Sequence, residues 1–435
     1  MIRSAVNFMI SLRIDNRALL LLTLSVFALV EISDLLVPYR AERFSLDSLI
    51  IYYAAFFLVF CGLTVSCFFR FSAAITIPSV ARVATATNVL VLLSFTSLLF
   101  VMYDRLFIQG VDYSQGIAQA REAWRALAAD REGASSIFNV VGNLLFPFVY
   151  FSIAFCVLFF ECSGRFRRNF YFSVILVFSF SVITGGRELL LVLFGVFLSS
   201  LSLRYTLRLP LLAKIMKKDF LLIFFVALIF SVYVGYLRSQ SYDFGMDEYG
   251  RSLATRLGAS GEKTVGVGEY TPDVILPVLI YLAHVKWVFI NMIGSEAGEG
   301  LSTFRQIFKM LLDYLALSFE WVDYLPPAYT PNWISLIGSV YYDLGWLGIF
   351  LYSMVLAFSP FLFRLLFSVR EFNGCGFSMA VYLFFSAIVI FSPFAFLFEV
   401  VQFIYLLVFV FFAFFASFLP VRKSGGLDSY ESRLR

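Results

Sequence analysis

Arg187 and Glu188 are the only charged residues in the apolar run Phe170–Leu203, and either side chain could take part in chemistry. An ionisable residue inside a membrane-spanning stretch is a functional-site hypothesis by default, because a charge is costly there. The planar guanidinium of arginine offers paired donors and keeps its charge when partly buried, which suits it to phosphate. Arg187 is therefore a candidate phosphate ligand. The structural alternative is that it pairs with Glu188 or with a phospholipid headgroup.

Three further arginines follow on the same predicted side of the membrane: Arg238 in "VYVGYLRSQSYDFG", and Arg251 and Arg256 in "YGRSLATRLG". Two or more arginines facing one membrane cavity indicate a binding site for a diphosphate. Arg187 and Arg238 are the stronger candidates, because both are tied to predicted membrane spans. For Arg251 and Arg256, the alternative is that they are solvated loop charges.

His284 is the only histidine and lies in the semi-apolar segment "LIYLAHVKWVF". A histidine at a membrane interface can act as a general base on a hydroxyl group, since its pKa lies near neutrality. The alternative is a structural histidine. A single histidine without clustered carboxylates does not match a metal centre, and no metal or other cofactor is expected. The segment "GVGEY" follows no predicted strand, so a nucleotide fold is not expected. No nucleic-acid partner is expected either.

The composition identifies the elements that must position these residues. The chain has 435 residues, of which 61% are hydrophobic and only 14% charged. Soluble domains are about 25% charged, and apolar stretches of about 20 residues are long enough to cross a bilayer. We therefore expect an all-α, polytopic transmembrane helical bundle in one integral-membrane domain, 1–435. About ten spans are expected, within a range of 10 to 14. They are predicted at 18–38, 48–69, 84–103, 137–160, 170–183, 188–203, 220–237, 340–363, 378–395 and 397–420.

The positions of basic residues predict the orientation of these spans. Compact clusters such as "RFRRN" and "AKIMKKD" favour the cytoplasm, which places both termini there. A medium loop, 104–136, and a long loop, 238–339, then lie outside. The long loop contains the apolar stretch 272–292, which we interpret as an interfacial or re-entrant helix. A full crossing at 272–292 is the alternative, and it would reverse the orientation of every later segment.

The turn Thr184-Gly185-Gly186 divides the run that contains Arg187, since paired glycines permit a tight turn. Its first arm, 170–183, would be only about 21 Å long as a helix, which is shorter than the hydrocarbon core. The sequence therefore predicts a turn that lies below the outer surface in a protein-lined cavity.

The segment 329–357 reads "YTPNWISLIGSVYYDLGWLGIFLYSMVLA" and carries a more specific pattern. A long loop that ends on this pattern before a span resembles the Wzy-type O-antigen polymerases, the bacterial oligosaccharide repeat unit polymerases. The matching residues are Pro331, Gly338, Tyr341 or Tyr342, Asp343, Gly345 and Gly348. The turn "TGGRELLLVLFG" and the basic Arg238 after the next span are similar to the same family. Close helix packing at small residues is the structural alternative for the glycines.

The resemblance implies a metal-independent membrane glycosyltransferase of the bacterial inner membrane. Its substrate would be an undecaprenyl-diphosphate-linked oligosaccharide, and its other partners would be membrane lipids and a chain-length-regulating co-polymerase. Arg187 and Arg238 would stabilise the diphosphate leaving group, assisted by Arg251 and Arg256. His284 is the candidate base, and Tyr341 and Tyr342 would lie near the substrate. We further expect Asp343 to position one of the arginines, because a carboxylate near the entrance of a span needs a partner.

Two other functions share some of these features. An O-antigen ligase, which moves finished glycan onto lipid A core, uses the same lipid donor and relies on a loop histidine, for which His284 is available. A flippase or other transporter of lipid-linked oligosaccharides would also use a charged cavity. Transporters commonly contain inverted repeats and several charges along their spans, and neither is evident in this sequence.

Overall fold

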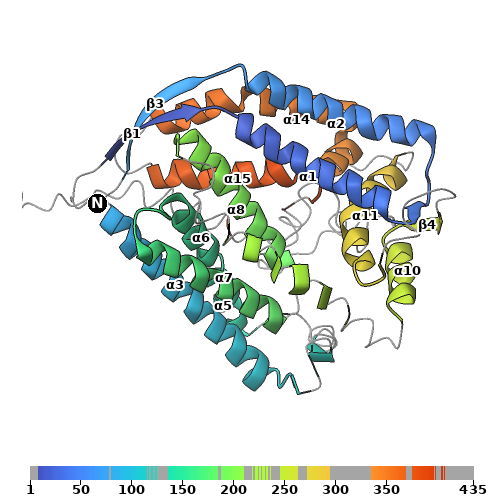
Figure 1. Ribbon diagram of the computed structural model, residues 1–435, viewed down its shortest axis with the longest axis horizontal. Helices are drawn as coiled ribbons and strands as arrows, with labels where there is room; N and C mark the ends of the chain where they lie inside the picture. The colour runs from blue at the N-terminus through green and yellow to red at the C-terminus, as the bar shows by residue number, and fades with distance from the viewer. Residues whose placement is uncertain are drawn as a thin grey trace, which may run out of the picture.

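The computed structural model describes residues 8–77, 80–114, 136–184, 188–209, 245–262, 272–293, 335–368 and 375–395, with shorter stretches within 116–124, 218–236 and 397–406. Within these residues the fold is an all-α bundle, as the sequence predicts (Figure 1). Seven helices are long and apolar enough to cross a membrane by length and composition. The chain is therefore a polytopic membrane protein.

The outer faces of the helices agree with a lipid environment. Large apolar side chains are exposed on several helices, among them Leu21 (64%), Phe57 (66%), Leu92 (63%) and Phe350 (54%). Soluble proteins rarely expose extended apolar surfaces. A helix that is hydrophobic on all sides is typical of a membrane span.

One group of helices lies along the upper edge of Figure 1. It consists of α1 (Arg17–Leu36), α2 (Leu46–Ser66) and the long α14 (Leu336–Ser368). Helix α2 begins with a capping box in which Ser45 and Ser48 satisfy each other's backbone N–H groups. Helix α14 approaches α2 closely at Gly62, where a Cβ atom would lie 2.3 Å from the backbone oxygen of Ser353. Only glycine fits this helix crossing.

A second group runs from the left of Figure 1 toward its lower right. It contains α3 (Val80–Tyr103), the π-helical turn η1 (Asp104–Ile108), α5 (Ile137–Leu145), α6 (Phe148–Leu158), α7 (Gly164–Thr184) and α8 (Glu188–Thr206). Helices α3 and α7 run side by side, and Asn169 donates a hydrogen bond of 2.6 Å to Asn88. Helix α15 (Cys375–Phe391) packs between the two groups, against α8 and α1.

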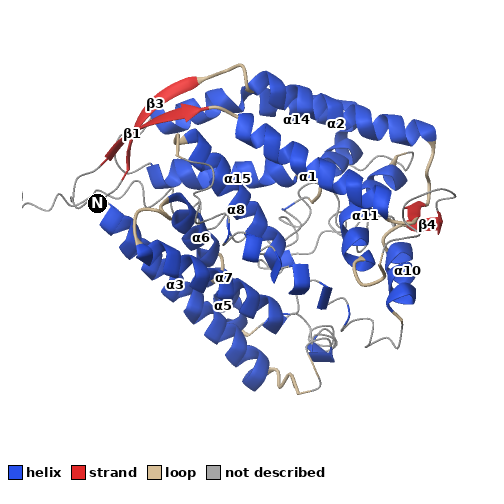
Figure 2. Ribbon diagram, in the orientation of Figure 1, coloured by secondary structure: helices blue, strands red, loops and turns tan. Residues whose placement is uncertain are grey.

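Two short antiparallel sheets, which the sequence analysis does not predict, lie at opposite ends of the bundle (Figure 2). Strand β1 (Phe8–Ile14) pairs with β3 (Phe71–Ile77), and β2 (Tyr39–Ala41) pairs with β4 (Ala259–Glu262). We call these the β1 end and the β2 end of the bundle. Helices α1, α3 and α7 begin at the β1 end and finish at the β2 end, whereas α8 runs in the opposite direction.

Two helices from the predicted long loop pack at the β2 end. Helix α10 (Met246–Arg256) leads into β4, and α11 (Leu276–Met292) packs against α1, α10, α2 and α14. The apolar stretch 272–292 therefore forms a helix of 17 residues. At 1.5 Å per residue, it is about 26 Å long.

The predicted boundaries hold closely for α1, α2 and α8, but the prediction for α7 is wrong. Helix α7 begins at Gly164 rather than at 170 and contains 21 residues, so it is about 31 Å long, close to the hydrocarbon thickness. Because α7 is long enough to cross the hydrocarbon core, its length does not support the predicted recessed turn. The predicted span 397–420 falls almost entirely outside the described residues, and 220–237 is described only in part.

Candidate functional site

A buried group of charged and aromatic side chains joins α11 to the first two helices at the β2 end. Lys286 Nζ lies 2.7 Å from Glu31 Oε2 and 3.0 Å from Asp34 Oδ2. It also donates to Tyr53 Oη at 3.1 Å, while Trp287 Nε1 donates to Asp34 Oδ1 at 2.9 Å. We call these five residues the Lys286 cluster.

The Lys286 cluster contains two carboxylates and one ammonium group. Tyr53 donates a hydrogen bond of 2.7 Å to Glu31, and the neighbouring Tyr52 donates a second of 2.9 Å. The ammonium also lies 5.2 Å from the ring centroid of Tyr53, within the range of a cation–π contact. The single Lys286 ammonium is shared between Glu31 and Asp34. The two tyrosine hydroxyl groups therefore partly satisfy the Glu31 carboxylate. The cluster thus replaces water around three charges with protein groups.

Backbone contacts hold the C-terminal end of α11 in the same place. Asn291 Nδ2 donates to the carbonyl of Gly258 at 2.6 Å, and the backbone N–H of Arg43 donates to Asn291 Oδ1 at 2.9 Å. One amide side chain therefore joins three segments: the connection between α1 and α2, the end of α10, and α11. Together with Lys286, it fixes the loop helix to the bundle.

The sequence carries a signal for the Lys286 cluster that the predictions above do not include. Glu31 and Asp34 are three residues apart near the end of the first apolar run, so they share one helix face. Two acids on one face of a membrane helix require a partner. Lys286 lies in the other semi-apolar segment considered above, but sequence alone does not connect two positions so far apart.

A second unusual group lies where α3 ends at the β2 end. Arg105 in η1 is only 4% exposed, and its Nε has no hydrogen-bond partner within the described residues. Its guanidinium stacks on Trp124, with Cζ 3.8 Å from the ring centroid. The adjacent Asp104 accepts hydrogen bonds from Gln109 and from Ser136, one on each carboxylate oxygen. This carboxylate binds other groups and makes no direct ion pair with Arg105 in the described structure, although the two side chains still attract each other through space.

Tyr113 connects this region to the end of α7. Its hydroxyl donates a hydrogen bond of 2.7 Å to the carbonyl of Ile183, which lies directly before the predicted turn. Burial raises the pKa of the Tyr113 phenol and nearby Arg105 lowers it in part, with a net upward shift. The hydroxyl therefore stays protonated and able to donate.

The two leading sequence candidates, Arg187 and Arg238, lie outside the described residues. Arg251 and Arg256 are exposed on α10. Both therefore lie at the surface of α10, and their role in substrate binding stays a prediction.

His284 is 1% exposed within α11, and its Nδ1 lies 2.7 Å from the carbonyl oxygen of Tyr281. Its ring also contacts the ring of Tyr281 edge-on, with centroids 6.1 Å apart. A general base must reach the proton that it removes. The burial of His284 favours the structural interpretation, and its catalytic role stays a prediction.

Asp343, Tyr341 and Tyr342 lie on the first arm of α14, next to α11. Tyr342 is buried against Val288 and Met292 of α11, and Asp343 is 8% exposed. The ring centroid of Tyr341 lies 5.5 Å from that of Phe289, also on α11. The segment that carries the family resemblance therefore contacts the helix from the long loop.

The glycines of this segment shape α14. Gly345 has φ +58° and ψ −142°, which interrupts the helix, and this backbone region is essentially restricted to glycine. At Gly348 a Cβ atom would lie 2.6 Å from the carbonyl oxygen of Val340. Gly345 thus bends the helix and Gly348 lets its two arms approach, in agreement with the packing alternative for Gly348.

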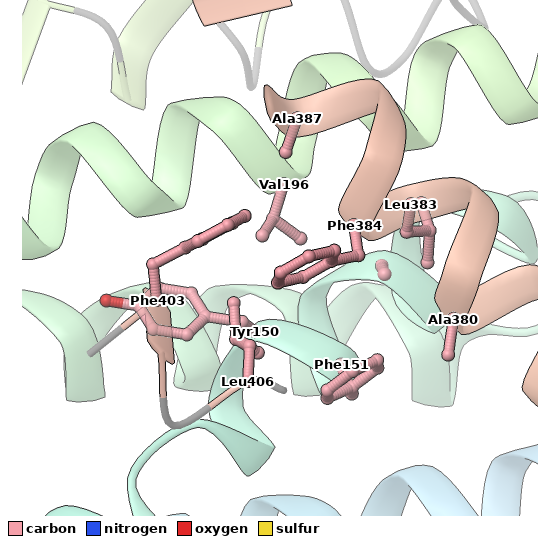
Figure 3. A pocket seen from close by; sticks show the side chains of 10 residues that line it. Tyr150, Phe151, Val196, Ala380, Leu383, Phe384, Ala387, Phe403 and Leu406 are labelled. Atoms are coloured by element: carbon pink, nitrogen blue, oxygen red, sulfur yellow. The ribbon is translucent and has the colours of Figure 1, made fainter. Parts of the chain in front are cut away.

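A small cavity in the bundle interior does not offer a second site. Figure 3 shows its lining, which is almost wholly apolar and comes from α6, α8, α15 and residues 403–406. Its volume is about 20 Å³, roughly the space of one water molecule. No sugar or acyl chain fits there.

Comparison with known proteins does not assign a family: no protein-family model, no curated protein and no solved structure matches the chain. Among the described residues, no group of three His, Cys, Asp or Glu side chains is arranged to hold a metal ion. The class that the fold defines is thus a polytopic helical membrane protein with loop helices docked at its β2 end.

Proposed function

We propose that the chain is a membrane glycosyltransferase that polymerises undecaprenyl-diphosphate-linked oligosaccharide repeat units into O-antigen or a related surface polysaccharide. The proposal places it in the bacterial inner membrane with both termini in the cytoplasm. The β2 end, with α10 and α11, then faces the periplasm.

The observation that best supports this proposal is the bend of α14 at Gly345. The bend separates a short arm, residues 336–344, from the long membrane helix, and the short arm packs against α11. Asp343 lies in this arm, close to the junction between the loop helices and the bundle. A lipid-linked donor from the membrane and a sugar acceptor from outside would meet at such a junction.

The reaction is a displacement at the anomeric carbon of the donor. A hydroxyl group of the acceptor sugar attacks this carbon and loses its proton to a general base, for which His284 stays the predicted candidate, and the lipid diphosphate leaves with the bonding electrons. Arg187 and Arg238 stabilise the negative charge that develops on the diphosphate. In this proposal Arg251 and Arg256, which are exposed on α10, hold phosphate or glycan during the exchange.

A polymerisation assay on purified protein tests this function. The substrate is a lipid-linked repeat unit, and product length is read on a gel. We expect Arg187→Ala to reduce turnover by about 10² to 10³-fold, as loss of a preorganised donor to a developing charge does. Arg168→Ala is the matched control, because Arg168 is an exposed arginine at the β1 end of α7. It should polymerise normally.

Wild-type chain length from Arg187→Ala at normal abundance contradicts the proposed role of this residue. Adding lipid A core to the same reaction separates polymerisation from ligation, since a ligase caps the core without lengthening the lipid-linked glycan. A flippase yields neither product and instead moves the lipid-linked substrate across a vesicle membrane.

A further inference from the structure

We infer that Arg105, with Trp124 and Tyr113 around it, forms a phosphate-binding site at the β2 end of the bundle. We call these three residues the Arg105 site. The ligand is a phosphate group presented at the membrane surface. The assignment to the diphosphate of a lipid-linked substrate rests on the proposed function, whereas phosphate binding itself does not.

The first argument is the free-energy cost of burying the Arg105 guanidinium. It is buried, and Nε lacks a hydrogen-bond partner within the described residues. A buried cation without a paired anion is strongly disfavoured. The neighbouring Asp104 offsets part of this cost through space, but both of its oxygens accept hydrogen bonds from other side chains and neither accepts one from the guanidinium.

Arg204 shows how this protein satisfies an arginine that has a structural role. Arg204 is 1% exposed. It donates to the carbonyls of Val157 at 2.7 Å and Leu158 at 3.2 Å, and it pairs with Glu161 at 3.3 Å. These groups cap the end of α6. Arg105 has no comparable set of acceptors in the described structure, which indicates that its partner is a ligand.

The second argument is the surroundings of the Arg105 guanidinium. Trp124 covers one face of it at 3.8 Å. Stacking of this kind fixes the plane of the fork, whose edge carries the N–H donors. Phosphate oxygens match this edge in the bidentate geometry that arginine favours.

The third argument is location. The backbone N–H of Val111 donates a hydrogen bond of 2.9 Å to the carbonyl oxygen of Arg105, which closes a turn after η1. Tyr113 then donates to the carbonyl of Ile183 at the end of α7. The Arg105 site and the end of α7 are therefore held together. The proposed function requires a diphosphate at this end of α7.

The test is ligand-dependent thermal stability of the purified full-length protein, with inorganic pyrophosphate as the probe. A ligand that binds only the folded state raises the melting temperature with concentration. We expect pyrophosphate to stabilise the wild type and to bind Arg105→Met at least about tenfold more weakly, since charge-assisted hydrogen bonds are lost. Arg168→Met, which alters an exposed arginine, should respond like the wild type.

The melting temperature without ligand separates binding from a structural role. Burying a charge that lacks a directly bonded anion is costly, so ligand-free Arg105→Met should melt at or above the wild-type temperature. A lower melting temperature with an undiminished response to pyrophosphate overturns the inference. Arg105→Lys, which retains charge without the planar fork, provides a second variant and should bind with intermediate affinity.

Two lipid compositions identify the source of the phosphate. In nanodiscs of phosphatidylcholine alone, the wild type should bind pyrophosphate as it does in detergent. If added phosphatidylglycerol weakens this binding in the wild type, a lipid headgroup occupies the Arg105 site. If it has no effect, the phosphate belongs to the lipid-linked substrate.

Failure of this inference and failure of the proposed function give different results. If the wild type makes no polymer but binds pyrophosphate, and Arg105→Met abolishes this binding, the phosphate site is supported and the proposed function is contradicted. If the wild type polymerises and Arg105→Met changes neither its KM nor its pyrophosphate affinity, the proposed function is supported and the phosphate site at Arg105 is contradicted.

Discussion

Replacing Lys286 with methionine should detach α11 from the bundle more effectively than any other single substitution in the Lys286 cluster. The change removes the one cation and leaves Glu31 and Asp34 facing each other in a buried position. Side-chain exposure is 7% for Lys286, 18% for Glu31 and 13% for Asp34. All three values lie well below a third, so water screens these charges weakly.

The expected magnitude follows from this burial. Removing one partner of a buried ion pair costs about 3–5 kcal/mol, because the remaining charge is left uncompensated. An unfolding entropy of about 2.1 cal/mol/K per residue, taken over 435 residues, gives about 0.9 kcal/mol/K. Lys286→Met should therefore lower the melting temperature by about 3 to 6 °C.

Local detachment of α11 can be measured directly. In a background without native cysteines, Val285→Cys places a thiol on α11 at a position that is 1% exposed in the folded protein. A membrane-impermeant maleimide should label this thiol slowly, and Lys286→Met should accelerate the labelling. Protein that still melts cooperatively but labels faster has lost the docking of α11 and not its whole fold.

The charge imbalance in the Lys286 cluster supplies the decisive comparison. Glu31→Gln leaves the pair of Lys286 and Asp34 intact at 3.0 Å, so it should cost only about 1–2 kcal/mol, the value of the lost hydrogen bonds. Combining Lys286→Met with Glu31→Gln and Asp34→Asn should recover much of the loss, because no charge is left unpaired. If Glu31→Gln costs as much as Lys286→Met, or if the triple variant recovers nothing, the electrostatic reasoning is refuted.

Two further predictions concern glycines. Gly62→Ala should destabilise the protein by about 1–3 kcal/mol through overpacking, because its methyl group meets the backbone of Ser353. The control for melting temperature is Gly195→Ala, whose Cβ would make ordinary contacts at 3.5 Å or more. Gly345→Ala should cost about 1–3 kcal/mol by forcing a side chain into a conformation restricted to glycine, whereas Gly164→Ala, which has open space, should change little. Equal melting temperatures within either pair would contradict the corresponding argument.

Hydropathy was sufficient to locate most of the bundle, since each span must satisfy its own backbone within one continuous apolar stretch. The start of α7 was missed because Arg165, Arg167 and Arg168 suggested a loop. Arginine is a good helix former, and these side chains are exposed in the first turns of the helix. The helix therefore extends past the apolar boundary that hydropathy detects.

The features that the sequence did not predict depend on distant partners. Strand β1 pairs with β3 across the whole of α1 and α2, and periodicity within either segment does not specify this pairing. The Lys286 cluster is likewise non-local. Hydropathy places the end of the span at 103 and so predicts a loop at Arg105, whereas η1 continues the helix through Ile108 and buries the guanidinium.

The Lys286 cluster has a consequence for synthesis of the chain. Glu31 enters the membrane 255 positions before Lys286 is made, and at about 5–20 residues per second this interval lasts on the order of 10 to 50 s. During that time the nascent first helix carries two acids without their cation, which disfavours their burial. The first helix therefore acquires its buried ion pairs only after Lys286 has been made.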